Sequence, residues 1–125
     1  MAFPGTYDFD YYRGDTFVFT ITPKTSAGAT FALDSYSAAG AIFTISSARG
    51  DDPDETINSV SNTGSLSAVI NTSTDIITCT IKPDARTVLL GGETYYYDVE
   101  IYNGAALRYT LLTGAITVTD DVTGA

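Results

Sequence analysis

The 125-residue sequence contains no histidine and no tryptophan, and only one cysteine and one methionine. Without histidine the chain cannot form the Ser-His or Cys-His pairs of nucleophilic catalysis, and the common histidine- and cysteine-based zinc sites are excluded too. The lone Cys79 cannot form an intramolecular disulfide, and it shares the alternation phase of Ile77 and Ile81. We therefore expect Cys79 to be a core side chain. The chain is predicted not to be an enzyme and to bind no cofactor and no metal.

Positive charge is also scarce, because six Lys and Arg stand against 15 Asp and Glu, for a net charge of −9. The cations are not clustered, so nucleic acid and anionic membranes are disfavoured as partners. The acidic run 51–55 lacks the ligand spacing and turn glycine of a dedicated calcium loop, so we expect an ordinary surface loop there.

The sequence has no secretory signal at its start and no stretch of membrane-spanning length. We expect synthesis and folding in a reducing cytoplasm. Without export, the integrin-type tripeptide Arg49-Gly50-Asp51 and the glycosylation sequon at Asn71 are expected to be chance matches.

What the sequence does contain is typical of strands: nine Tyr, six Phe and many Thr, Val and Ile in short alternating runs about ten residues apart. This predicts a single all-β domain over residues 1–125, an immunoglobulin-like antiparallel β-sandwich of about eight strands. Leu89, two glycines and then Tyr95 match the corner in which a tyrosine of such a sandwich bonds back to the backbone.

The last third of the chain alternates most clearly, beginning with residues 95–102. A three-residue loop at 102–104 would keep the apolar faces together and would place Asp98 opposite Arg108. A two-residue loop at 113–114 would follow. These turns predict a three-stranded meander.

Earlier runs predict further strands. Residues Phe17, Phe19 and Ile21 alternate inward, and similar strands are expected at 56–60, 65–70 and 75–81. A strand at 40–46 has an ambiguous phase, because Ile42, Phe43 and Ile45 cannot share one face. Asp84 is predicted to cap one helical turn through 85–89.

The N-terminal residues 1–12 are aromatic and acidic, and two interpretations remain open. They form an edge strand of the sandwich, or an arm that docks on a neighbouring subunit, since exposed aromatics near a chain end are costly in water.

Several motifs together resemble the N-terminal domain of the upper baseplate protein of tailed bacteriophages, over roughly residues 14–123. The matching segments are Gly14-Asp15-Thr16-Phe17, Leu33-Asp34, Ile81, Gly91 or Gly92, Tyr95-Tyr96-Tyr97-Asp98-Val99-Glu100, Gly114-Ala115-Ile116-Thr117-Val118 and Asp121-Val122-Thr123. The resemblance implies a β-sandwich module of a phage virion. The upper baseplate protein continues into segments that hold receptor-binding proteins, whereas this sequence ends at Ala125. An adaptor in the tail, baseplate or neck, or a capsid decoration (cement) protein, is therefore the expectation.

Such a protein would act by contacts with other virion proteins and with copies of itself, as a homo-oligomer or a symmetric assembly on the particle. Tyrosine and phenylalanine are favoured interface anchors. The predicted contact residues are Phe3, Tyr7, Phe9, Tyr11, Tyr96 and Tyr102. The alternative function is a carbohydrate- or surface-binding β-sandwich in which exposed tyrosines stack on the ligand.

Overall fold

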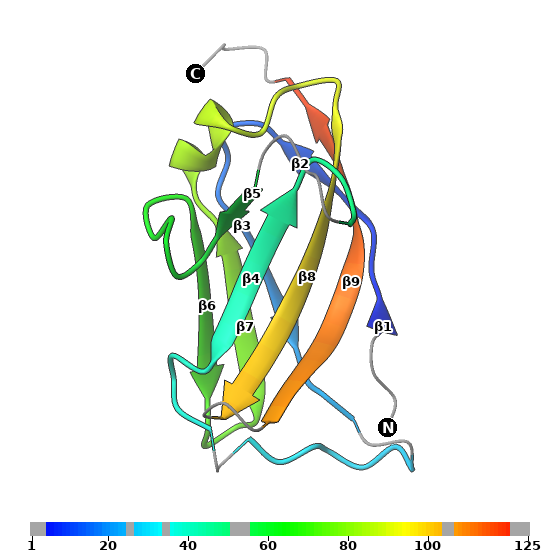
Figure 1. The fold of residues 1–125 in the computed structure, drawn as a ribbon, viewed down its shortest axis with the longest axis vertical. Coiled ribbons are helices and arrows are strands. Elements are labelled where there is room, and N and C mark those ends of the chain that lie inside the picture. Colours follow the sequence, from blue (N-terminus) through cyan, green and yellow to red (C-terminus); the bar gives the residue numbers. More distant parts are fainter. Residues whose placement is uncertain (1–4, 25–26, 34–35, 51–55, 104–106, 121–125) are drawn as a thin grey trace.

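The computed structural model describes residues 5–24, 27–33, 36–50, 56–103 and 107–120 (Figure 1). Within these ranges the chain forms strands and one short 3₁₀ helix, Pro83–Thr87. The strands are β1 (Gly5–Thr6), β2 (Phe9–Tyr12), β3 (Phe17–Ile21), β4 (Ala41–Ser46), β5 (Thr56–Asn58), β6 (Leu66–Asn71), β7 (Ile76–Ile81), β8 (Thr94–Asn103) and β9 (Leu107–Thr119).

The strands form two sheets that pack face to face, so the predicted all-β sandwich is confirmed (Figure 1). The larger sheet has the order β1-β9-β8-β4-β5, with β2 following β1 along β9, and the smaller sheet has the order β3-β7-β6. Pairing is antiparallel throughout except where β1 and β2 run parallel to β9. Residues 5–12 therefore form an edge strand of their own sheet, which was the first of the two N-terminal predictions.

The core lies between the two sheets and follows the period-2 alternation of the strands. The inward sets predicted for β3, β6 and β7 are confirmed, and Cys79 is fully buried as expected. The ambiguous phase of β4 is resolved by its neighbours: Phe43 and Ile45 point inward and Ile42 outward, because Phe43 pairs with Val99 of β8. Aromatic rings fill the middle of the core, where Phe19 packs edge-on against Phe43.

The predicted three-stranded meander was wrong. β9 continues through positions 113 and 114 without a turn, so β8 and β9 pair with each other along one long ladder. The loop at its end was also misplaced, because Tyr102 pairs with Arg108 and Asn103 with Leu107, which leaves residues 104–106 between the strands. A bulge between Val99 and Glu100 shifts the register by one residue, so Leu111 and Ile116 both face the core without the predicted turn at 113–114.

Gly114 occupies the middle of β9 because another segment passes against it. The break between β1 and β2, at Tyr7 and Asp8, lies against Gly114. The hydroxyl of Tyr97 donates a hydrogen bond of 2.6 Å to the carbonyl of Tyr7. Asp8 accepts a bond of 2.9 Å from the N–H of Ala115. A Cβ at Gly114 would overlap the Tyr7 carbonyl oxygen and lie 2.9 Å from Cε1 of Tyr97. Only glycine allows this approach.

The corner before β8 has the predicted tyrosine contact. The hydroxyl of Tyr95 accepts a hydrogen bond of 2.9 Å from the N–H of Leu90 and donates one of 3.1 Å to the carbonyl of Val88. The helical turn before it differs from the prediction. Pro83 opens a 3₁₀ helix that Asp84 does not cap, because Lys82 holds the N-cap position and no side chain caps it.

We predict that Gly114→Ala lowers the free energy of unfolding by about 1–3 kcal/mol, because the new methyl group overpacks the Tyr7 crossing. Urea unfolding measures the change. Gly64→Ala is the matched control, since its Cβ would lie 3.8 Å from the nearest atom, an Asp84 carboxylate oxygen. It should change stability by less than about 0.5 kcal/mol. Equal losses in both variants would contradict the crossing argument.

We predict that Tyr95→Phe costs about 1–2 kcal/mol, because the N–H of Leu90 and the carbonyl of Val88 lose their shared partner in a partly buried corner. Tyr96→Phe is the control, since the Tyr96 hydroxyl makes no hydrogen bond to the described residues. Thermal unfolding at fixed pH compares the two. A Tyr95 variant as stable as the Tyr96 variant would show that the corner contributes nothing.

Candidate protein-binding face

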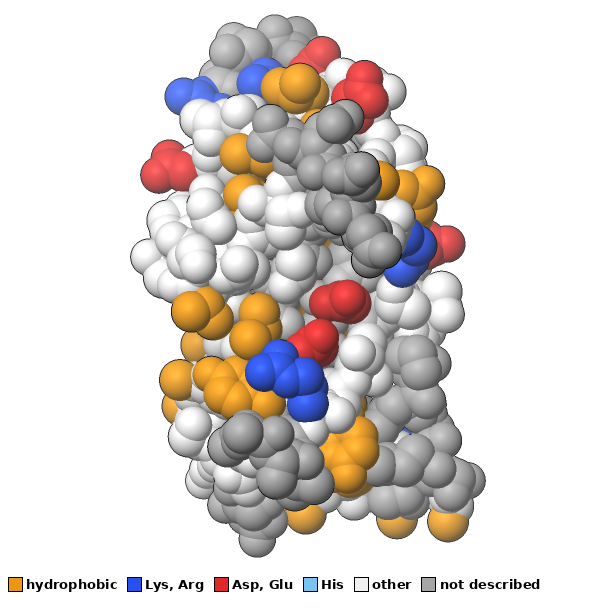
Figure 2. Space-filling view, in the orientation of Figure 1, with side chains coloured by type: hydrophobic (Ala, Val, Ile, Leu, Met, Phe, Trp, Pro, Cys, Tyr) orange, Lys and Arg blue, Asp and Glu red, His pale blue; other side chains and the backbone are white. Residues whose placement is uncertain are grey.

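The outward side of the larger sheet carries the most organised group of surface side chains. Along β8, Tyr96, Asp98, Glu100 and Tyr102 alternate with buried residues and are half-buried. Figure 2 shows acidic and basic side chains next to one another in the middle of this face. We call this surface the Tyr-Arg face, comprising Arg49, Tyr96, Asp98, Glu100, Tyr102 and Arg108.

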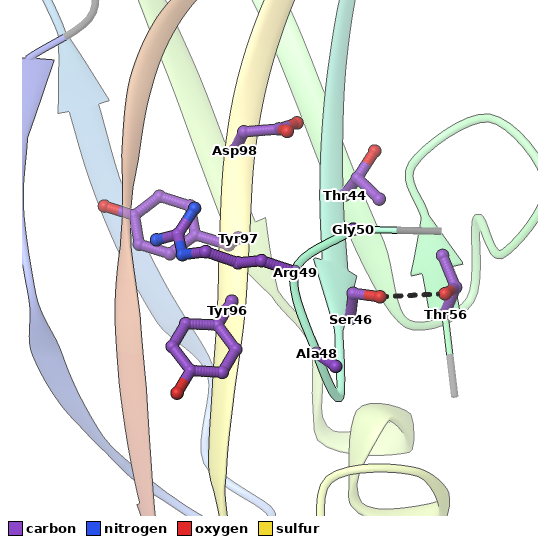
Figure 3. Close-up of a pocket in the computed structure, with 9 residues that line it drawn as sticks. All are labelled: Thr44, Ser46, Ala48, Arg49, Gly50, Thr56, Tyr96, Tyr97 and Asp98. Atoms are coloured by element: carbon purple, nitrogen blue, oxygen red, sulfur yellow. Dashed lines mark hydrogen bonds between the residues drawn. The ribbon is translucent and has the colours of Figure 1, made fainter. Parts of the chain in front are cut away.

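Arg49 follows β4 and extends across β8 to the next strand (Figure 3). Its guanidinium lies 4.9 Å from the centre of the Tyr96 ring. It also donates 2.8 Å to the hydroxyl of Thr113 and 3.0 Å to the carbonyl of Gly114. The arginine is thus held by a cation–π contact and two hydrogen bonds, which fixes the ring beneath it.

Arg108 makes the corresponding contacts at the other end of the face. It forms an ion pair of 2.7 Å with Glu100, and its guanidinium lies 5.4 Å from the centre of the Tyr102 ring. The Tyr102 hydroxyl donates to the carbonyl of Ala39 at 3.2 Å. The predicted pair of Asp98 with Arg108 was wrong, because β8 extends to Asn103 and pairs it with Leu107, which places Arg108 opposite Tyr102 and beside Glu100.

Asp98 lies between the two Arg-Tyr pairs and lines a shallow cavity of about 340 Å³ (Figure 3). It makes no hydrogen bond or ion pair with the described residues. Burial raises the pKa of the Asp98 carboxyl, and the charge of Glu100 raises it further, while Arg49 opposes the shift. Several hydroxyl-bearing side chains also line this cavity, and two of them, Ser46 and Thr56, are joined by a 2.9 Å hydrogen bond.

A second shallow cavity of about 520 Å³ continues this surface toward the other end of β8. It shares Thr44 with the first cavity and also contacts Glu100, Tyr102 and Arg108. Ile42 and the exposed Val60 supply apolar area. The face thus offers apolar patches, aromatic rings and both signs of charge.

The six predicted contact residues are distributed over several places. Tyr96 and Tyr102 lie on the Tyr-Arg face, and Tyr7 is 44% exposed at the opposite edge of β9. Phe9 and Tyr11 are buried in the chain's own core, where the Tyr11 hydroxyl donates to the Asp15 carbonyl at 2.7 Å. They are therefore unavailable as anchors for a neighbour in this structure, which corrects that prediction. Phe3 lies outside the described residues.

Sequence reasoning missed both arginines of the face. Arg49 was noticed only as part of the tripeptide Arg49-Gly50-Asp51, and its guanidinium is occupied by contacts within the chain. Arg108 was assigned to the wrong carboxylate. The useful signal was present, because alternation placed Tyr96 and Tyr102 on the outward side of one strand, where arginine commonly stacks on tyrosine.

Groups with catalytic or metal-binding chemistry are sparse in the described residues. Burial raises the pKa of the Cys79 thiol to about 12, so it stays protonated at neutral pH. No group of three or more Asp, Glu, Cys or His side chains is placed to hold a metal ion in the described ranges, and the acidic run 51–55 lies outside them. In the same ranges no helix has the length and apolar character needed to cross a membrane.

No protein-family model matches this sequence, and a search of curated proteins finds no significant match.

We predict that Asp98→Asn stabilises the protein at pH 7 and that this gain disappears as the pH falls through the raised pKa of Asp98. A carboxyl with a raised folded-state pKa prefers its protonated form in the fold, so ionisation near neutral pH is destabilising. Melting temperatures from pH 4 to pH 7 measure the difference. Asp10→Asn, an exposed position on β2, makes the same change in net charge and serves as control. A gain that is independent of pH would contradict the argument.

Proposed function

We propose that this chain is a non-enzymatic structural protein of a tailed-bacteriophage particle, an adaptor of the tail, baseplate or neck or a decoration protein of the capsid. It acts by protein–protein contacts. The observation that carries the proposal is the Tyr-Arg face, because tyrosine and arginine are enriched at the energetic centres of protein interfaces. Their contacts with the chain hold these side chains in place before binding, which lowers the entropy lost on association.

The strand order supports an immunoglobulin-like interpretation of the sandwich. The neighbours β9-β8-β4-β5 correspond to strands G, F, C and C′ of a variable-type domain, and β3-β7-β6 correspond to strands B, E and D. Tyr95 at the start of β8 corresponds to the tyrosine corner of strand F. The segments that resemble the phage baseplate domain fall on this framework: residues 14–17 lead into β3, and 95–100 form the centre of β8.

Carbohydrate or surface binding by stacking on exposed tyrosines is less well supported. Arg49 lies over the ring of Tyr96, and Arg108 over the ring of Tyr102. A sugar would have to displace a guanidinium from either ring. A protein partner can instead use the exposed guanidinium edges and the carboxylates beside them, and a basic partner would complement the net charge of −9.

The proposal is tested by quantitative mass spectrometry of purified particles of the phage that encodes this chain. Abundance near that of the major capsid protein would support a decoration role, and a small fraction of it would support the tail, baseplate or neck. Absence from the particle would overturn the proposal.

The role of the face is tested in the same particles with Tyr96→Ala combined with Tyr102→Ala. Copy number should fall at least about tenfold, as expected for the loss of interface anchors. Val69→Ala, on the outer side of the smaller sheet, is the control and should be incorporated normally. Normal incorporation of the double variant would show that the contact surface lies elsewhere.

A further inference from the structure

Among the residues that the structure describes, one edge of the sandwich is left open. β3 pairs with β7 on one side only, and its residues make no other backbone hydrogen bond to the described part of the chain. An unpaired edge exposes a row of N–H and C=O groups that can pair with another strand. The outward side chains of β3 are also accessible, with Val18 53% exposed and Thr20 exposed.

The other three edges carry features that oppose pairing. The β1–β2 edge is interrupted at Tyr7 and Asp8, and its outward positions include Asp10. β5 is only three residues long. On the free side of β6, the N–H of Ile70 donates to the carbonyl of Ala38 at 3.1 Å. β3 has none of these features: its five residues include no proline, no charge and no bulge.

Charge restricts what can approach this edge. The protein carries a net charge of −9, so two copies repel each other over most surfaces. The outward side of the smaller sheet is the exception, since β3, β6 and β7 contain no charged residue. Two copies of β3 can therefore pair without placing like charges opposite each other within the strands.

The sequence of β3 is complementary to itself in antiparallel register. Pairing two copies about a two-fold axis at Phe19 places Phe17 opposite Ile21 of the other copy, and Val18 opposite its Thr20. Every apolar inward residue then faces an apolar inward residue, so the register satisfies both faces. Phe17 and Ile21 are half-buried in the single chain, and their side chains would become more buried against the second copy.

An apolar groove lies next to the same edge. It has a volume of about 380 Å³ and is lined by Tyr7, Phe19 and Leu112 among others, where the edges of the two sheets separate. The Tyr7 ring, 44% exposed, lies 6.1 Å from the Phe19 ring. Covering this groove adds apolar area to a contact made through β3.

We infer that β3 is a self-association edge, through which two copies of this chain pair antiparallel and join their smaller sheets into one continuous sheet. This pairing follows from the edges of the two sheets and does not require that the protein belong to a virion. One short strand pair buries less than a standard interface, so the free dimer is weak and gains strength when many copies are held together.

The test is sedimentation equilibrium of the purified full chain from about 10 µM to 1 mM, a range that spans weak dimers. The wild-type mass should rise with concentration from 13.2 kDa toward twice that value. The double variants V18K/T20K and V18E/T20E should each weaken association at least about tenfold, because like charges become directly opposed across the axis. An equimolar mixture of the two should associate again, because each lysine then faces a glutamate.

Val69→Lys is the control, since Val69 is 50% exposed on the same sheet but lies on β6, away from the β3 edge. It should associate like the wild type. Circular dichroism confirms that all variants are folded, and recovery in the mixture shows the same independently. A wild-type protein that remains monomeric throughout, charged variants that associate normally, a mixture that fails to recover, or loss of association in Val69→Lys would each overturn the inference.

Discussion

The close approach of the Tyr7 carbonyl to Gly114 is the constraint on which much of this structure depends. At this point the N-terminal segment leaves the regular ladder, and the Tyr97 hydroxyl and the Asp8 carboxylate supply the hydrogen bonds that the ladder loses. Phe9 and Tyr11 can then enter the core from β2, where Phe9 stacks on Phe17 with ring centres 4.5 Å apart. Without a glycine in β9, the edge strand could not lie this close to its own sheet.

The same stretch of β9 also anchors the outward face. Arg49 donates to the Thr113 hydroxyl and to the Gly114 carbonyl while it covers the Tyr96 ring. The N-terminal edge and the Tyr-Arg face are therefore attached to neighbouring atoms of one strand. A substitution at Gly114 would disturb both the N-terminal edge strand and the Arg49 contacts. The stability of the edge strand and the order of the Tyr-Arg face are therefore coupled.

Local alternation predicted the all-β class and the inward residues of β3, β6 and β7, because the period of two is set by the strand itself. It failed at Gly114, which looks like a turn residue until a segment more than a hundred residues away is placed against it. A loop predicted two residues too early was enough to assign Arg108 to the wrong carboxylate. Aromatic content alone also could not show whether Phe9 fills its own core or a neighbour's.

The tyrosine corner was predictable because its signal is local: two glycines and a tyrosine within a few residues of the carbonyl that the tyrosine binds. The Tyr-Arg face was only half predictable. The alternation of β8 correctly predicted that Tyr96 and Tyr102 point outward. The arginines come from a loop and from another strand, so their contacts depend on the register of the whole sheet. The phase of a strand can be predicted from its own residues, whereas the contacts between side chains of different strands depend on the whole fold.

The parallel pairing of β1 and β2 with β9 also has a mechanical consequence. In a parallel pair, the N-terminal end of one strand and the C-terminal end of the other lie at opposite ends of the ladder. Tension applied between the start of β1 and the end of β9 would therefore load the ladder in shear, so that its hydrogen bonds must fail together. A domain held in this way would resist extension along its own chain far better than it resists peeling from one corner.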